Sequence, residues 1–234
     1  RLFICFLVAL WSACSAFSAE EPMALSTPAV ARLINAAEKS VKDSRGWADD
    51  LLDVLKLHNL PASKENICAA IAIIDQESSF VADPAVAGLG KISEAALRAK
   101  MDKVPVLGRV ALHFLEVTPS PADNYLARIR AARTERDLDL VYRAMVADAG
   151  KQTGLGLVIN SGLLNKQIDG RNEIDTIGSM QVSVDFALEV AKRRRWLPMA
   201  LDDVYALRDE LYTRHGGMYY GVLLRLGYET GYSR

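Results

Sequence analysis

Apolar residues recur every three or four positions along most of the chain, which is the spacing of one face of an α-helix. The stretches with this pattern are 27–37, 47–58, 63–80, 185–196, 202–214 and 218–226. Capping residues mark further helix starts at Ser120-Pro121 and at Thr134, each with an aspartate three residues after the Ser or Thr. The pattern predicts a mainly helical fold.

The stretch 154–184 breaks this pattern. Five glycines, at positions 154, 156, 162, 170 and 178, punctuate β-branched and apolar residues there. Glycines at such intervals favour turns over helix, so we expect a loop with a short β-hairpin. The predicted fold class is therefore mainly α with one small β-hairpin.

The composition is that of an ordinary globular protein. Half of the 234 residues are hydrophobic, 24% are charged, and 28 Lys and Arg oppose 29 Asp and Glu, which gives a net charge of −1. This balance lacks the basic face that nucleic-acid binding requires, so we expect no nucleic-acid partner. The three cysteines are too few for a disulfide scaffold.

The amino terminus is predicted to be an export signal. Arg1 precedes an apolar run from Leu2 to Trp11, and small residues follow up to Ala19. These features are typical of a secretory signal peptide, which we assign to residues 1–19. Ser12-Ala13-Cys14 offers an alternative, a lipoprotein signal that ends at Cys14, whose lipid would anchor the protein in a membrane. Both predict an exported protein, periplasmic or anchored to the outer membrane of a bacterium.

The sequence lacks the residue patterns of several common kinds of functional site. The three histidines, at 58, 113 and 215, are far apart and form no zinc-binding pattern, so we expect no metal. No G-x-S-x-G nucleophile motif occurs, and Gly150-Lys151 lacks the rest of a phosphate-binding loop. The basic run 192–195 indicates a solvated helix face, with a grip on an anionic wall polymer or membrane surface as the alternative. No cofactor is implied.

One acidic residue ends an apolar helix. In the predicted helix that starts at Ser63, positions 67, 70, 71 and 74 share one face, and Glu77 continues it one turn further. We therefore expect Glu77 to project from the buried side, with Asp75 well around the helix from it. A carboxyl group against apolar walls keeps its proton to higher pH, as a general acid must. The alternative is a carboxylate that caps the helix or forms a salt bridge.

The residues around Glu77 resemble a known motif. The run Gln76-Glu77-Ser78-Ser79-Phe80, followed by Gly88-Leu89-Gly90, is similar to the first motif of lytic transglycosylases and goose-type lysozymes. The run Gly178-Ser179-Met180-Gln181 resembles their second motif, Gly-Leu-Met-Gln, with Ser179 in place of leucine. The pattern is also similar to a family of bacterial lipoproteins of unknown function that is thought to be related to these enzymes.

The resemblance implies a lysozyme-like helical fold and a role for each matching position. Glu77 would be the catalytic acid/base, and Ser78 would contact the sugar near the cleaved bond. Gly178, Met180 and Gln181 would line the cleft, and Gln181 would hydrogen-bond the glycan. Peptidoglycan glycan strands would be the partner.

This chain departs from the family's pattern in two ways. Its two motifs lie much farther apart, so we expect a helical insertion at about 91–176 within a lysozyme-like domain of residues 20–234. The family's third motif, a Tyr-Asn pair, is absent, and we place it beyond Arg234, because the chain starts without Met and we expect it to be truncated. Three nearby tyrosines are expected to be packing residues, namely Tyr219, Tyr220 and Tyr228.

The activity implied by the resemblance is cleavage of peptidoglycan by a single carboxylic acid. A lytic transglycosylase forms 1,6-anhydromuramic acid ends and consumes no water, whereas a muramidase needs a second carboxylate. Asp169, Glu173 and Asp175 precede Gly178 and are the candidates for such a second group. Two alternatives remain, an envelope lipoprotein that keeps a lysozyme-like cleft and binds glycan without cutting it, and an unrelated helical envelope protein.

Overall fold

A computed structural model describes residues 25–154, 168–170, 172–196 and 198–227. The predicted signal at 1–19, with Cys14, lies outside the described residues, as does Tyr228. Within the described part of the chain, no helix has both the length and the apolar character needed to cross a membrane.

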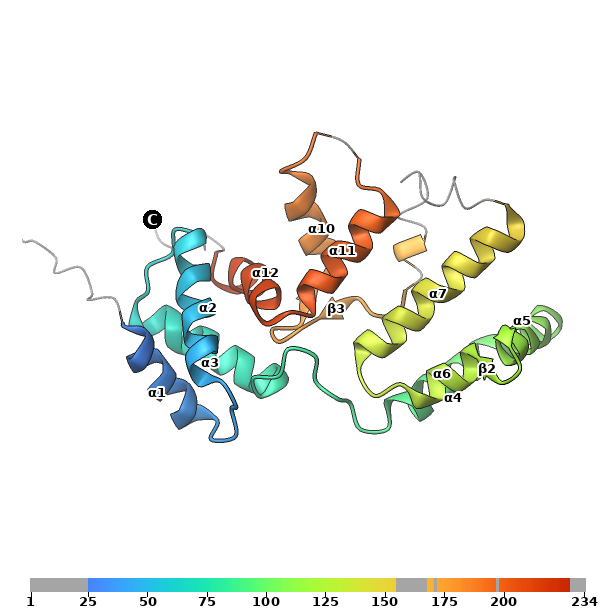
Figure 1. Ribbon diagram of the computed structural model, residues 1–234, viewed down its shortest axis with the longest axis horizontal. Coiled ribbons are helices and arrows are strands. Elements are labelled where there is room, and N and C mark those ends of the chain that lie inside the picture. Colours follow the sequence, from blue (N-terminus) through green and yellow to red (C-terminus); the bar gives the residue numbers. More distant parts are fainter. Residues whose placement is uncertain (1–24, 155–167, 171, 197, 228–234) are drawn as a thin grey trace, which may run out of the picture.

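The described chain is mainly helical, as the hydrophobic pattern predicts (Figure 1). The helices are α1 (Thr27–Ala37), α2 (Ser44–Leu57), α3 (Lys64–Ser78), α4 (Leu89–Asp102), α5 (Pro105–Val117), α6 (Tyr125–Ala131), α7 (Glu135–Thr153), α10 (Val184–Lys192), α11 (Leu201–Leu211) and α12 (Arg214–Leu226). Strand β1 (Pro119–Ser120) pairs antiparallel with β2 (Asp123–Asn124), and β3 (Thr176–Ile177) with β4 (Val182–Ser183). The β3–β4 pair confirms the hairpin predicted within 154–184.

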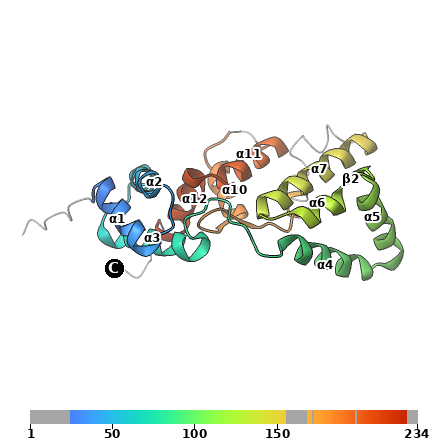
Figure 2. The ribbon, with the colours of Figure 1, turned by 60° about the horizontal axis from the view of Figure 1, so that its bottom comes forward.

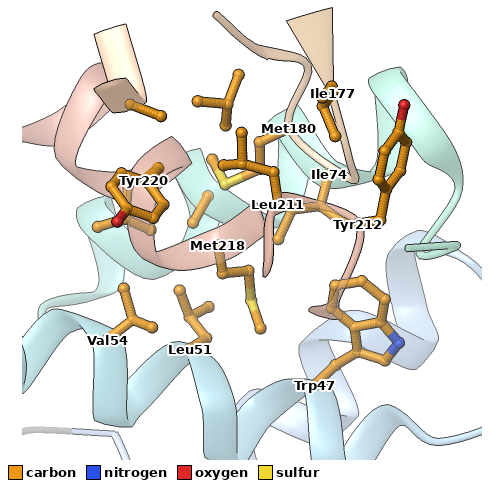
Figure 3. Packing of buried hydrophobic residues seen from close by; sticks show 14 of the residues in the cluster. Trp47, Leu51, Val54, Ile74, Ile177, Met180, Leu211, Tyr212, Met218 and Tyr220 are labelled. Carbon is orange, nitrogen blue, oxygen red and sulfur yellow. The ribbon is translucent and has the colours of Figure 1, made fainter. Parts of the chain in front are cut away.

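Helices from both ends of the chain share the larger hydrophobic core. Helices α1 to α3 pack with α10 to α12 and with the β3–β4 hairpin, while α4 to α7 lie to one side (Figures 1 and 2). Ile74 of α3, Met180 of the hairpin and Met218 of α12 meet inside this core (Figure 3). The hairpin is thus held by residues that stand far before it and after it in the sequence.

A smaller core lies among α4 to α7. Its buried members are Leu115, Tyr125, Leu126, Ile129 and Val141. Helix α4 approaches α6 closely, because a Cβ atom on Gly90 would lie 2.2 Å from the carbonyl oxygen of Arg130. These helices occupy the region where the sequence predicts a helical insertion.

Two predicted helix starts are confirmed. The Ser63 side chain caps α3 by accepting from the backbone N–H of Asn66 at 3.3 Å. Thr134 and Asp137 form a capping box at the start of α7, in which each side chain accepts a hydrogen bond from the backbone of the other residue. Both helices therefore begin where their orphan N–H groups find side-chain acceptors.

The helix start predicted at Ser120 is wrong. The Ser120 hydroxyl does accept from the backbone N–H of Asp123 at 3.2 Å, but both residues pair in the β1–β2 hairpin. Helix α6 begins at Tyr125 and is capped by Asn124. A serine directly before the turn closes the hairpin with the same local hydrogen bond that a helix cap would use.

Candidate functional site

Helix α3 ends in a sharp turn just after Glu77 and Ser78. Ser79 and Phe80 follow with φ values of 49° and 60°, in the left-handed region that stops a helix. The Phe80 ring is buried and packs edge-on against Trp47, with ring centroids 5.4 Å apart. This anchor holds the end of α3 and the loop after it against the core.

The turn of the β3–β4 hairpin lies against the end of α11. Gly178 has a φ of 80°, and a Cβ atom on it would lie 2.2 Å from the carbonyl oxygen of Leu211. Gln181 has a φ of 46° and donates its backbone N–H to Gly178 at 3.1 Å, which closes the turn. Only glycine fits at position 178, because any side chain there would meet the backbone of α11.

A buried hydrogen bond joins these two segments. The Ser78 hydroxyl lies 3.1 Å from the carbonyl oxygen of Ser179 and 3.0 Å from that of Ile74, and the two serines stand 101 residues apart in the sequence. Ile74 and Met180, from the same two segments, lie in the same hydrophobic core (Figure 3). The fold therefore brings together the two segments whose sequences stand out.

Glu77 is solvent-exposed, so the prediction that it projects from the buried side of α3 is wrong. The buried residues of α3 are Ile67, Ala70, Ile71, Ile74 and Ser78. At about 100° per residue, Glu77 lies roughly 80° from the centre of this stripe, whereas Ser78 lies near its centre. The spacing of positions 67, 70, 71 and 74 is compatible with either Glu77 or Ser78 as the next buried position of the helix. In the packed structure the buried residue is Ser78.

The residues predicted to contact glycan differ in how far their side chains are buried. Ser78 is buried and uses its hydroxyl within the protein. Met180 is fully buried and supports the hairpin from below, while Gly178 contributes backbone only. The Gln181 side chain is half-buried, and its Oε1 accepts from the Thr176 hydroxyl at 2.8 Å. Of the residues predicted to contact glycan, Gln181 is therefore the one whose side chain reaches solvent.

Two carboxyl groups that the sequence did not single out lie near the start of α7. Burial raises the pKa of Glu135, in the first turn of α7, as do the charges of Asp83 and Asp175. Burial likewise raises the pKa of Asp83, whose Oδ1 is buried and has no hydrogen-bond partner among the described residues. Both groups hold their protons to higher pH than ordinary carboxyls, a property common at functional sites.

A buried hydroxyl lies close to this pair. Within the part of the chain that the structure describes, the Tyr212 hydroxyl has no hydrogen-bond partner, and burial, with the charges of Asp139, Glu135 and Asp83, raises its pKa. Arg136 lies 5.9 Å from the Tyr212 ring. The site thus combines carboxyl, amide and phenol groups from the loop after α3, the hairpin, α7 and α11.

The three acidic residues predicted as alternatives for a second carboxylate line a neighbouring polar pocket of about 370 Å³. Asp169 pairs with the buried Arg208 at 2.9 Å, and burial raises its pKa. Glu173 pairs with Lys100, and Asp175 is the one whose charge acts on Glu135. Asp169 and Glu173 are therefore engaged in ion pairs.

Arg208 itself is a buried structural residue. It is 1% exposed and bonds to Asp139 at 2.8 Å, to Asp169 and to the carbonyl oxygen of Ile174. The network ties α11 to α7 and to the segment before β3. A buried guanidinium is tolerated here because its charge is paired and its N–H groups are bonded.

The described residues contain no group of three or more His, Cys, Asp or Glu arranged to hold a metal ion. His58 contacts the carbonyl oxygen of Tyr219 at 2.8 Å, and His215 lies 3.2 Å from Asp53. The Tyr219 and Tyr220 rings pack edge to face, with centroids 5.0 Å apart. His58, Tyr219 and Tyr220 thus make packing and polar contacts within the fold, whereas His215 contacts Asp53 at the surface.

Comparisons with known proteins give a family but no function. A family model described as "Protein of unknown function (DUF1615)" matches residues 40–234. The uncharacterized protein YaiW of Escherichia coli (strain K12) is 29% identical over 194 residues, which is 83% of this chain. The match covers 49% of YaiW, so the chain spans about half the length of that relative. No solved structure matches.

Proposed function

This chain belongs to the DUF1615 family of proteins of unknown function, and on that premise we propose that it is an exported peptidoglycan-cleaving enzyme, a lytic transglycosylase with Glu77 as its acid/base. The proposal is carried by the hydrogen bond from Ser78 to Ser179. A resemblance divided between two distant segments has functional meaning only when the fold unites them, and this bond lies between the two segments that resemble the motifs.

The proposed chemistry needs one carboxyl group. Protonated Glu77 gives its proton to the glycosidic oxygen as the bond from that oxygen to the anomeric carbon of the muramic acid breaks. The resulting carboxylate takes the proton of the sugar's own 6-hydroxyl, and that oxygen bonds to the anomeric carbon. Glu77 is thereby reprotonated, a 1,6-anhydro end forms, and neither water nor a cofactor is consumed.

The exposure of Glu77 supports access by a polymer. A glycan strand is long and stiff, so its cleaved bond must lie at an open surface rather than in a closed cavity. Gln181, half-buried beside the same junction, would hydrogen-bond the strand. Ser78 would act through the backbone of Ser179, which it fixes.

Digestion of purified peptidoglycan tests the activity. We expect mass spectrometry to show anhydro-muropeptides with the wild-type protein and none with Glu77→Gln. Glu65→Gln is the matched control, because it changes an exposed glutamate at the other end of the same helix. Reducing ends instead of anhydro ends would identify a muramidase, and full activity of Glu77→Gln would remove Glu77 from the reaction.

A second candidate function is a non-catalytic envelope lipoprotein that binds glycan through the same site. The exposure of Glu77 favours it, because the fold does not enclose that side chain among apolar residues. Co-sedimentation with peptidoglycan that releases no fragments would support this function over cleavage.

Export and anchoring belong to the same proposal. The mature protein would reside in the periplasm or be held at the outer membrane by lipid on Cys14. The intact mass of the protein recovered from the envelope distinguishes cleavage after the signal from lipidation at Cys14. Recovery of an uncleaved chain from the cytoplasm would contradict both.

A further inference from the structure

The connection between α10 and α11 carries a tryptophan whose side chain lies entirely in solvent. Trp196 is 102% exposed, whereas Trp47 in the larger core is 5% exposed. Across the described part of the chain, no other large apolar side chain is as exposed as that of Trp196. An indole ring offers about 150–250 Å² of surface, and tryptophans are on average highly buried. The connection therefore presents a large apolar surface that the fold itself does not cover.

The chain is anchored on both sides of Trp196. The backbone N–H of Arg195 donates to the carbonyl oxygen of Lys192 at 3.0 Å, which continues the last turn of α10. The Arg195 guanidinium pairs with Asp203 of α11 at 2.8 Å. On the other side, Met199 is buried in the larger core. The indole ring is thus presented from a segment that contacts of its neighbours hold in place.

Two arginines just before Trp196 keep their charge at the surface. Arg193 is exposed and has no ion-pair partner among the residues that the structure describes. Arg194 is exposed too, and its guanidinium lies 5.4 Å from the centroid of the Tyr219 ring, a contact that leaves the positive charge in place. The other two cations of the run 192–195 are paired with carboxylates. Arg193 and Arg194 therefore place two positive charges beside the exposed ring.

This combination matches the interface of an anionic lipid bilayer. Tryptophan is enriched where acyl chains meet headgroups, because its ring is apolar and its N–H is polar. Arginine near an anionic lipid surface is attracted to it. The connection lies at the edge of the molecule (Figure 1), where it can touch a flat surface. A small ligand or a sugar is bound instead in a concave site, and none of the residues that line the polar pocket belongs to this connection.

We propose that Arg193, Arg194 and Trp196 form a docking surface for a bilayer that contains anionic phospholipid. The Trp196 ring enters the headgroup region, and the two guanidinium groups pair with lipid phosphates. The inference goes beyond the proposed cleavage of glycan. It uses no residue of the candidate site, so it stands or fails independently of the proposed function.

Vesicle sedimentation tests this surface. The protein is used as residues 20–234, which lack the predicted signal and keep every residue of both hydrophobic cores. With vesicles of phosphatidylglycerol and phosphatidylcholine, we expect Trp196→Ala to weaken binding at least about tenfold, and Arg193→Gln and Arg194→Gln about fivefold each. Vesicles of phosphatidylcholine alone should bind the wild type much more weakly. Absence of wild-type binding, or binding by Trp196→Ala that equals the wild type, would overturn the proposal.

Two matched variants control for effects away from this surface. Arg32→Gln makes the same charge change at an exposed arginine of α1, and Leu107→Ala shortens an exposed apolar side chain of α5. Both should bind vesicles like the wild type. Equal losses for Arg32→Gln and Arg193→Gln would mean that net charge alone attracts the bilayer. A loss in Leu107→Ala without one in Trp196→Ala would place the contact on α5, and either result contradicts the proposal.

Tryptophan fluorescence reports directly on the indole ring. Residues 20–234 contain two tryptophans, and Trp47 is already buried. When anionic vesicles are added, we expect the emission to shift to shorter wavelength in the wild type and not in Trp196→Phe. Raising the salt concentration from about 0.1 M to about 1 M shortens the screening length from about 10 Å to about 3 Å. It should therefore weaken binding by the wild type more than binding by the double variant Arg193→Gln/Arg194→Gln. Bound protein without the emission shift would contradict entry of the ring into the bilayer.

Sedimentation with insoluble peptidoglycan separates the bilayer from a wall polymer. We expect Trp196→Ala and the double arginine variant to bind peptidoglycan as the wild type does. If these variants lose peptidoglycan binding while the wild type ignores vesicles, the surface serves the polymer and the bilayer assignment is wrong. A circular dichroism spectrum of each variant confirms that it is folded.

Discussion

The close contact at the hairpin turn makes Gly178→Ala the most informative substitution. A Cβ atom at position 178 would lie 2.2 Å from the carbonyl oxygen of Leu211, whereas ordinary contacts begin at 3.4 Å. The turn must therefore move by about 1 Å or more, and such forced packing costs roughly 1–3 kcal/mol. The positive φ adds about 1–2 kcal/mol for a residue with a Cβ. We expect a total loss in the free energy of unfolding of roughly 2–5 kcal/mol.

Gly88→Ala separates the two contributions. Gly88 has a φ of 72°, close to the 80° of Gly178, but a Cβ atom there would have no neighbour within 4 Å. It should therefore lose only the backbone part, about 1–2 kcal/mol.

Equilibrium urea unfolding measures both losses, and a melting curve provides a second measure. For a protein of this size, 1 kcal/mol corresponds to about 2–4 °C in the melting temperature. Equal losses for Gly178→Ala and Gly88→Ala would refute the reasoning, because they would mean that the hairpin turn is not pressed against α11.

Three further substitutions test the packing and the charges. Met180→Ala removes a fully buried side chain and should cost about 2–5 kcal/mol in urea unfolding; a loss below about 1 kcal/mol would contradict its place in the core. Asp139→Ala leaves the buried Arg208 without its closest carboxylate and should cost about 3–5 kcal/mol, so an unchanged melting temperature would speak against the buried network. Arg130 and Arg98 lower the pKa of Glu94 from 4.5 to about 2, so the stability that ionised Glu94 contributes is present above pH 4.5 and lost as pH falls through 2. The difference in melting temperature between the wild type and Glu94→Gln should shrink over that range, and a difference independent of pH would exclude this origin.

The local elements could be predicted because their signals are local. Ser63 and the Thr134–Asp137 capping box place helix starts correctly, and the glycines around 178 indicate the hairpin. The start at Ser120 failed because the same serine–backbone hydrogen bond closes a turn as well as a helix.

The candidate site could be predicted only in part. The end of α3 and the hairpin turn are recognisable from their residues. Whether Glu77 is buried or exposed depends on which neighbouring face of α3 packs against the core, and the spacing of its apolar residues does not decide this. Glu135 follows a clear cap and could be placed in the first turn of a helix. Its raised pKa could not be read from the sequence, because Asp83 comes near Glu135 only after the start of α7 pairs with the loop after α3.

The sequence alone thus determined the mainly helical class and the approximate extents of six helices, together with the two short segments that resemble a glycan-cleaving motif. These features depend on side-chain periodicity and on hydrogen bonds between residues a few positions apart. The tertiary structure alone decided that Ser78 meets Ser179 and that Ser78 rather than Glu77 faces the core. Such contacts are set by how distant elements share buried surface, and no local pattern encodes that.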